Sequence, residues 1–349
     1  MSYIVERADL AADRDTILSF WRNNHPKPLE NKFQWMYQGN PHGRALVWTI
    51  KYGPTGACVG MVAVFPRRLY AGEGTMLAGI MGDFLIHEGH RTAGPAVMLM
   101  RSVRQAVPDA GIALLYGFPN KGAEPIMKRA GFQRLGQMIR LTRVLNTRSL
   151  LVKYLVPGVA ARLVSPIADW ALRFRSGDGG ACRRCGLVCR EEKAFDDRYA
   201  EAWRPRRNRV PVLVERTTAY LWWKYLDDPD DTNRIFSASD SAGQRLKGYL
   251  VFRWDEDSVE IREIVSAGED ESRCLLSSFI GYIRGQSPGS LVVKILETPV
   301  GVREFAQLGF RRRQSGRSVY WYGGGETAPA VSMLGDSAKW FLMGGDEDT

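Results

Sequence analysis

Residues Met81–Val103 read MGDFLIHEGHRTAGPAVMLMRSV, and this stretch decides the fold expected for the chain. Its beginning continues an apolar run that favours a strand, whereas a helical pattern starts at Pro95. Between them lies the loop from Arg91 to Ala96, in which Gly94 lets the backbone approach a ligand closely. Pro95 lacks an N–H but fits a first helical turn. The stretch therefore predicts a strand, a loop whose amides face an anion at a helix N-terminus, and a helix.

The pattern around this stretch occurs twice in the chain. Both copies follow the order strand, helix, strand, helix, Gly-Phe, and we interpret them as a duplication. The alternation of strands and helices predicts α/β domains with mixed sheets. The matching landmarks are WMYQGNP (35–41) with WKYLDDP (223–229), GMVAVF (60–65) with GYLVFR (248–253), and GF (131–132) with GF (309–310).

The expected fold class is α/β (α+β), with two tandem domains of central mixed sheets flanked by helices. We expect a first domain at 1–140, a basic helical insertion and connector at 141–204, a second domain at 205–322 and a C-terminal tail at 323–349. In the tail, Trp340–Leu342 is expected to pack by its apolar side chains, and the acidic residues beyond it to be disordered.

Composition excludes several classes of protein. Of 349 residues, 45% are hydrophobic and 25% are charged, which is typical of globular chains and not of disordered ones. The N-terminal residues are too charged for a signal peptide, and no apolar run approaches the ~20 residues of a membrane span. Five cysteines are too few for a disulfide scaffold. These features predict a cytoplasmic protein.

The net charge of +10 is concentrated in one segment. Residues 140–209 contain 16 Lys and Arg against 7 Asp and Glu, a net +9. The apolar, basic part at 149–175 permits peripheral contact with anionic lipid, although packing between the domains is the simpler interpretation. Cys182, Cys185 and Cys189 could present three thiolates to a metal ion, but no fourth Cys or His lies near, and we expect no metal.

The first copy resembles the GNAT superfamily, the Gcn5-related N-acetyltransferases. Arg91-Thr-Ala-Gly94-Pro-Ala96 fits the loop R/Q-x-x-G-x-G/A of that superfamily. Asn120 and the pair Gly131-Phe132 match its later motif, an Asn followed after ten intervening residues by Gly-Phe. The resemblance covers most of residues 1–140 and continues more weakly through about 205–322. It implies acetyl-CoA, or another acyl-CoA, as a cosubstrate.

The resemblance also implies which residues bind this cosubstrate. The loop amides would face the pyrophosphate of coenzyme A (CoA), and the strand before the loop would pair with pantetheine as another strand would. Asn120 matches a position that commonly contacts CoA or a bound water. The implied residues are Phe84, Leu85, Ile86, Arg91, Thr92, Ala93, Gly94, Pro95, Ala96 and Asn120.

The chemistry implied is direct attack of an amine on the thioester, which needs a base, donors for the oxyanion and an acid for the thiolate. Many members carry a Tyr as the acid seven positions after the Asn, where this chain has Met127. Tyr116 is the nearest phenol in the sequence. Asp83 is the first candidate base because a buried carboxylate is costly unless it is paired or has a function, and His87 is the second. A structural ion pair is the alternative role for Asp83.

The second copy lacks the features of the loop. Asp270 and Glu271 stand where His90 and Arg91 stand in the first copy, and their negative charge would repel a pyrophosphate. We therefore expect CoA to bind to the N-terminal domain only, and the second domain to shape the acceptor site or the interface.

Three functions are compatible with these observations. The first is an acyl-CoA-dependent N-acyltransferase that acts on a small-molecule or peptide amine. The second is an aminoacyl-tRNA-dependent peptidyltransferase-like enzyme, which the basic segment would suit and the intact loop disfavours. The third is a non-catalytic CoA-binding or scaffold protein. We expect the first, without a nucleic-acid partner. The sequence gives no oligomeric state, acceptor or acyl chain length.

Overall fold

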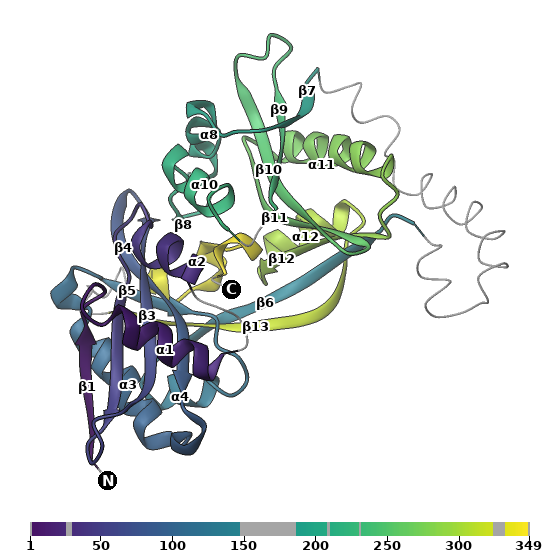
Figure 1. Ribbon diagram of the computed structural model, residues 1–349. Helices are drawn as coiled ribbons and strands as arrows, with labels where there is room; N and C mark the ends of the chain where they lie inside the picture. The colour runs from purple at the N-terminus through teal and green to yellow at the C-terminus, as the bar shows by residue number, and fades with distance from the viewer. Residues whose placement is uncertain are drawn as a thin grey trace.

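The computed structural model describes residues 2–25, 30–146, 186–207, 210–229, 232–323 and 332–347. Their strands form one fourteen-stranded sheet (Figure 1). Residues up to 146 are called the first half and residues from 186 the second half. The sheet order is β1 (Tyr3–Ala8), β2 (Leu46–Tyr52), β3 (Cys58–Ala71), β4 (Gly74–Ile86), β5 (Leu114–Gly117), β13 (Arg311–Gly323), β6 (Gln133–Val144), β12 (Ser290–Leu296), β11 (Ser258–Ser266), β10 (Leu246–Asp255), β9 (Arg234–Ser239) and β7 (Val188–Glu192), with β8 (Val212–Val214) and β14 (Trp340–Phe341) beside this path.

The last strand of each half lies in the sheet of the other half. β13 pairs with β5 of the first half, β6 pairs with β12 of the second half, and β6 and β13 pair with each other. These two long strands run between the halves in Figure 1. The strand order is therefore the same from either end of the sheet: five strands of one half are followed by the last strand of the other half. The mixed α/β fold is confirmed, and the exchange of the last strands was not expected.

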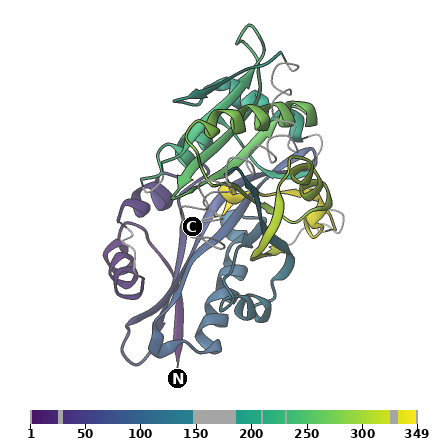
Figure 2. The ribbon, with the colours of Figure 1, turned by 90° about the vertical axis from the view of Figure 1, so that its right-hand side faces the viewer.

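Helices cover both faces of the sheet in each half. In the first half, α1 (Arg14–Asn24) and the π-helix η1 (Phe33–Gln38) pack on one face, and α3 (Ala93–Ala106) and α4 (Glu124–Arg129) pack on the other. The buried side chains of α3 recur at the three- and four-residue spacing of one helix face. In the second half, α11 (Glu269–Arg284) and α12 (Pro299–Gln307) lie opposite α8 (Asp197–Ala202) and α10 (Thr218–Tyr225) (Figure 2). The remaining short helices are α2 (Glu30–Lys32), η2 (Glu88–His90), η3 (Pro108–Ala110), α9 (Arg204–Arg207), η4 (Ser337–Lys339) and η5 (Gly344–Asp346).

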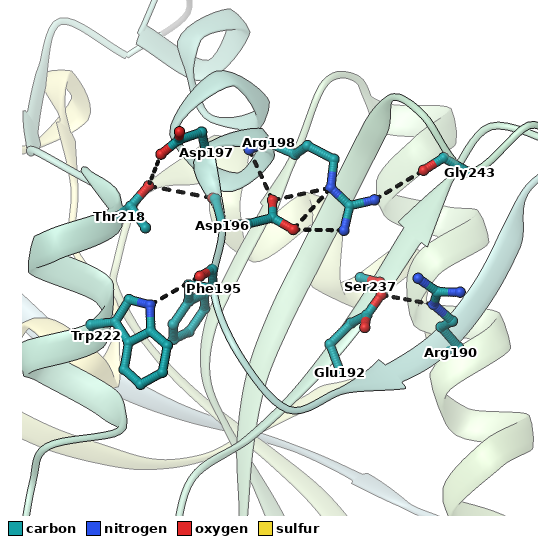
Figure 3. A network of polar contacts seen from close by, with 10 residues as sticks. All are labelled: Arg190, Glu192, Phe195, Asp196, Asp197, Arg198, Thr218, Trp222, Ser237 and Gly243. Carbon is teal, nitrogen blue, oxygen red and sulfur yellow. Dashed lines mark hydrogen bonds and ion pairs between the residues drawn. The ribbon is translucent and has the colours of Figure 1, made fainter.

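A polar network fixes α8 and α10 to the second half of the sheet (Figure 3). Asp196 caps α8 by accepting from the backbone N–H of Arg198, and its carboxylate also pairs with the Arg198 guanidinium. That guanidinium donates to the carbonyl of Gly243 in the turn before β10. The indole of Trp222 in α10 donates to the carbonyl of Phe195 at 2.9 Å. These contacts hold the two helices against the strands that they cover.

The matching tryptophans of the two copies contact each other. The indole N–H of Trp35 donates to the carbonyl of Trp223, and the indole N–H of Trp223 donates to the carbonyl of Trp35, at 2.6 and 2.9 Å. The ring centroids are 5.5 Å apart. This reciprocal contact joins two positions that the sequence matches at an offset of 188 residues.

Two sequence expectations concern the C-terminal tail and the connector between the halves. The C-terminal tail does not end its packing at Leu342, because Met343 through Glu347 are buried as well. The expected disorder beyond Leu342 is therefore wrong as far as Glu347. The apolar segment 149–175, together with Cys182 and Cys185, lies outside the described residues. Among the described residues, no helix is both long and apolar enough to cross a membrane.

Candidate functional site

β4 separates from β5 where the two strands reach the middle of the molecule. Their parallel pairing runs from Ala78–Leu114 to Met81–Gly117 and ends there, although β4 continues to Ile86. The pairing of β4 with β3 is irregular at the same place, and Asp83 has a φ of +50°. A positive φ is uncommon for a residue with a side chain and marks a local distortion. The end of β4 therefore turns one of its edges away from its neighbour.

A cavity of about 630 Å³ occupies the space that this divergence opens. Its size is that of typical small-molecule sites. One wall comes from β4, the end of β5, α1 and the segment around η1, and the other wall comes from the second half. The lining residues are Trp21, His25, Lys32, Trp35, Met81–Leu85, Met100, Gly117–Asn120, Ala123, Met127, Asp228, Arg253, Arg262, Lys294 and Arg317.

Asp83 faces this cavity and is also paired. The Nζ of Lys32 lies 2.8 Å from its Oδ1, and the hydroxyl of Tyr37 donates to its Oδ2 at 2.7 Å. The side chains of Asp83 and Lys32 are 7% and 15% exposed. Burial, reinforced by the charge of Asp83, raises the pKa of Tyr37 well above its usual range, so that the phenol stays protonated and donates. The structural ion pair that the sequence left open for Asp83 is present, at the edge of a cavity.

The predicted anion-binding loop lies at the start of α3. Thr92 precedes the helix with an extended backbone, and Ala93 and Gly94 follow in the first turn, where amides have no intrahelical acceptor. A Cβ placed on Gly94 would meet no atom within 4 Å, so the space above it is open. The Nε of Arg91 donates to the carbonyl of Ile86, which ties the loop to the end of β4. The strand, loop and helix expected for Met81–Val103 are confirmed.

A smaller cavity of about 360 Å³ adjoins the loop. It is lined by residues 22–25 of α1 and its C-terminal end, together with His87, Glu88 and Arg91. His25 lines both cavities, and its ring lies 4.3 Å from the ring of Trp21. The two cavities are thus both adjacent to His25.

The remaining predicted site residues have different positions. Asn120 lines the larger cavity, and its Oδ1 accepts from the amides of Gly122 and Ala123. His87 lies at the smaller cavity, where its Nδ1 accepts from the amide of Gly89. Tyr116 is fully buried between Phe118 and Trp340 and lines neither cavity. We do not retain Tyr116 as a catalytic group, since substrate at the cavity would not reach it.

The wall from the second half is basic, and sequence reasoning did not predict it. Arg253, Arg262, Lys294 and Arg317 come from β10, β11, β12 and β13, which lie in one sheet. Arg253 and Lys294 both pair at 2.9 Å with the carboxylate of Glu260 beneath them. No motif marks these residues, because they are far apart in the sequence and each lies on an otherwise ordinary strand.

The second half contains a counterpart of the Tyr37–Asp83 pair. The hydroxyl of Tyr225 donates to Glu263 at 2.6 Å, and β11 separates from β12 after Ile261–Val293 as β4 does from β5. Here the C-terminal segment fills the space: Leu296 donates to the carbonyl of Leu342, and the carboxylate of Asp346 pairs with Arg216 at 2.8 Å. Burial raises the pKa of Asp346, and the Arg216 guanidinium opposes that rise.

No group of three or more His, Cys, Asp or Glu side chains that could hold a metal ion occurs within the described parts of the chain. Because Cys182 and Cys185 lie outside those parts, the cysteine spacing in the connector stays untested.

Comparison with known proteins finds a matching domain family and solved structures with a similar fold. Residues 11–135 match the acetyltransferase (GNAT) domain family. A mycothiol acetyltransferase from Kineococcus radiotolerans is 29% identical over 111 residues, which are 32% of this chain, and the match spans about a third (36%) of that relative's length. A probable N-acyltransferase from Enterococcus faecalis has a TM-score of 0.67 at 12% identity, covering 93% of this chain and 73% of its own.

A GCN5-related N-acetyltransferase from Anabaena variabilis has a TM-score of 0.66 at 12% identity, covering 92% of this chain and 72% of its own. These two structures share the fold with this chain. The matched range 11–135 contains the strand, the loop and the helix that border both cavities. Residues 11–135, about a third of the chain, therefore match the acetyltransferase (GNAT) domain, and the chain as a whole shares its fold with the two solved structures.

Proposed function

We propose that the protein is an acyl-CoA-dependent N-acyltransferase, with acetyl-CoA as its donor. The observation that carries the proposal is the separation of β4 from β5 after Met81–Gly117, which turns Phe84 and Leu85 toward a cavity. The edge of β4 that β5 leaves can accept the amide groups of an extended ligand as a further strand would. The first turn of α3, with open space above Gly94, supplies amides for an anion.

In the proposed reaction, the nitrogen of the acceptor amine bonds to the thioester carbonyl carbon. The bond from that carbon to sulfur breaks, and the thiolate leaves and takes up a proton. Asp83 is the proposed base, because its carboxylate faces the cavity and already holds one ammonium, that of Lys32. An acceptor ammonium would take the same kind of position before it loses its proton. Tyr37 orients the carboxylate through its second oxygen.

The proton for the leaving thiolate needs another donor, since Met127 occupies the position of the usual tyrosine. Met127 lines the larger cavity and has no proton to give. We propose His25 for this role, because it lines both cavities and a protonated imidazole can donate a proton. His87 is less suitable because its Nδ1 is used by the turn at Gly89.

We further propose that only the first half binds CoA. In the second half, Leu342 and Met343 occupy the space beside β12 that corresponds to the cavity. The first turn of α11 also contains Glu269, Asp270 and Glu271, and their charges disfavour an anion at that helix N-terminus. Both features support a stoichiometry of one CoA per chain.

The experiment is a titration of the protein with CoA and acetyl-CoA, compared between Gly94→Leu and Gly281→Leu. Each of these helical glycines is exposed, and a Cβ on either would meet nothing within 4 Å, so both variants should fold. We expect one site per chain, loss of binding in Gly94→Leu and unchanged binding in Gly281→Leu. Two CoA per chain would contradict the assignment to the first half.

The same titration separates the other functions. Binding of CoA without transfer to any amine would favour a scaffold role. Salt-sensitive binding of tRNA without binding of CoA would favour a peptidyltransferase-like enzyme.

A further inference from the structure

We infer that the acceptor carries an anionic group, a carboxylate or a phosphate, in addition to its amine, and that the basic wall of the larger cavity binds this group. The wall consists of Arg253, Arg262, Lys294 and Arg317. This inference rests on the proposed N-acyltransferase function and names the class of acceptor for the same site.

The charges at the cavity are unequal on its two sides. Asp83 on the first wall is balanced by Lys32, so this pair adds no net charge. The second wall presents four cationic side chains to the cavity, against one carboxylate, Asp228, that lines it. Glu260 lies beneath and is shared by Arg253 and Lys294. With Glu347, which is buried beside the same cations, the described residues of this wall hold four cations against three carboxylates, an excess of one positive charge.

The pKa shifts of two buried carboxylates reflect the positive charge of this wall, which outweighs burial at Glu260 and only opposes it at Glu347. Burial acts to raise the pKa of Glu260, but Lys294, Arg262 and Arg253 outweigh it and lower the pKa below its ordinary value. Glu347 of the C-terminal segment is buried beside the same cations, Lys294, Arg317 and Arg262, which oppose the rise that burial gives to its pKa. The protein thus already holds carboxylates of its own against these side chains.

The position of the wall assigns it to the acceptor and not to CoA. Arg91, which begins the loop where a pyrophosphate would lie, lines the smaller cavity together with His87. The four cations line only the larger cavity and belong to strands of the second half. The larger cavity also contains Asp83, the proposed base. An amine at Asp83 and an anion at the opposite wall would therefore belong to one molecule that spans the cavity.

Arginine is well suited to this recognition, because its planar guanidinium forms two parallel hydrogen bonds to a carboxylate or a phosphate. Lys294 is about one-third exposed and Arg317 is exposed, so both side chains are accessible to a ligand. The expected acceptors are amino acids, peptides with a free carboxylate, or phosphorylated amines. Neutral amines should be poor substrates.

The test compares pairs of acceptors in which one member has the anionic group and the other lacks it. Glycylglycine is compared with glycylglycinamide, and glucosamine 6-phosphate with glucosamine, at saturating acetyl-CoA and with release of CoA as the readout. We expect kcat/KM to favour the charged member of at least one pair by about tenfold or more, as charge-assisted hydrogen bonds allow. The pair that responds identifies a carboxylate or a phosphate as the group.

Variants connect this preference to the wall. The double variant Lys294→Gln, Arg317→Gln should lose the preference, whereas Arg313→Gln should retain it. Arg313 is a matched control because it is an exposed arginine on β13 that does not line the cavity. Equal kcat/KM for both members of both pairs would overturn the inference. So would a double variant that raises KM for acetyl-CoA and leaves the acceptor preference intact, because the wall would then bind the donor.

A binding measurement keeps this test separate from that of the proposed function. Each probe is titrated into the CoA-loaded protein and followed by saturation-transfer NMR. If no amine is acylated but the charged probes bind and the double variant loses them, the anion site stands and the proposed chemistry fails. If amines are acylated and charged and neutral probes bind alike, the chemistry stands and the anion site is overturned.

Discussion

The Tyr37–Asp83 pair of the first half and the Tyr225–Glu263 pair of the second half have the same local contact and different surroundings. Asp83 lies at the edge of a cavity, paired with a lysine that lines it too. Glu263 is sealed: it contacts Tyr225, Tyr249 and Arg216, and Arg216 in turn binds Asp346 near the end of the chain. The difference shows that strand divergence alone does not make a site, because the same divergence can be closed by a few residues of the chain itself.

The sealed network should be far more important for stability than the open pair. Arg216→Leu leaves the carboxylates of Glu263 and Asp346 buried without their cation, and we expect a loss of about 3–5 kcal/mol in the free energy of unfolding. Lys32→Leu should cost less, about 1–3 kcal/mol, since Asp83 lies at the edge of a cavity and keeps its hydrogen bond from Tyr37. Urea denaturation of both variants measures the difference, and equal losses would contradict it.

The effects on kcat should follow the opposite order, with the larger loss at Asp83 and the smaller at Glu263. Asp83→Asn should lower kcat by about 100-fold or more if Asp83 is the base, because general-base catalysis contributes at least that factor. CoA affinity should stay unchanged. Glu263→Gln, its sealed counterpart, should affect kcat only through stability. Steady-state kinetics at a temperature where both variants are folded tests this, and an Asp83→Asn enzyme with normal kcat would refute the assignment.

The reciprocal tryptophan contact offers a more symmetrical comparison. Trp35→Phe and Trp223→Phe each remove one indole donor and leave one carbonyl without its partner. We expect each to cost about 1 kcal/mol, the usual net contribution of a hydrogen bond. Thermal unfolding of the two single variants should therefore give similar shifts. A large shift in only one of them would mean that the two sides of the contact are not equivalent.

The smallest effect concerns acid stability. The pKa of Glu260 is lower in the folded protein than its ordinary value of 4.5, so Glu260 adds stability above that pH and loses it as the pH falls through the folded value. Asp346, whose pKa is raised, contributes with the opposite sign. Glu260→Gln should flatten the fall of stability below about pH 4.5. Denaturation curves between pH 6 and pH 3.5 test this, and an unchanged slope would contradict it.

Much of the first half could be predicted from the sequence because its signals are local. The turn from strand to helix at Arg91–Ala96 depends on neighbouring residues, and so does the end of β5 at Gly117, three residues before Asn120. The tryptophans at 35 and 223, which the sequence matches, contact each other, and the duplication itself stays a prediction. The contact of Asp83 with Lys32 and Tyr37 could not be predicted, because these residues are separated by 51 and 46 positions.

The second wall of the cavity escaped prediction for a similar reason. Arg253, Arg262, Lys294 and Arg317 are single charges on four strands, and only the order of the sheet brings them to one surface. The tail was misjudged because its acidic composition favours solvent. In the structure, Asp346 is buried because Arg216 pairs with it. No local pattern in the sequence indicates this distant partner.

The exchange of the last strands has a consequence for synthesis of the protein on the ribosome. β5 can pair with β13 only after residues 311–323 have left the ribosome, and β6 can pair with β12 only after residues 290–296 have left it. The amino-terminal half is therefore translated long before its sheet can be completed, and its open strand edge needs protection from other nascent chains in that interval. Neither half completes its own sheet, and the native sheet can form only after residues 311–323 have emerged.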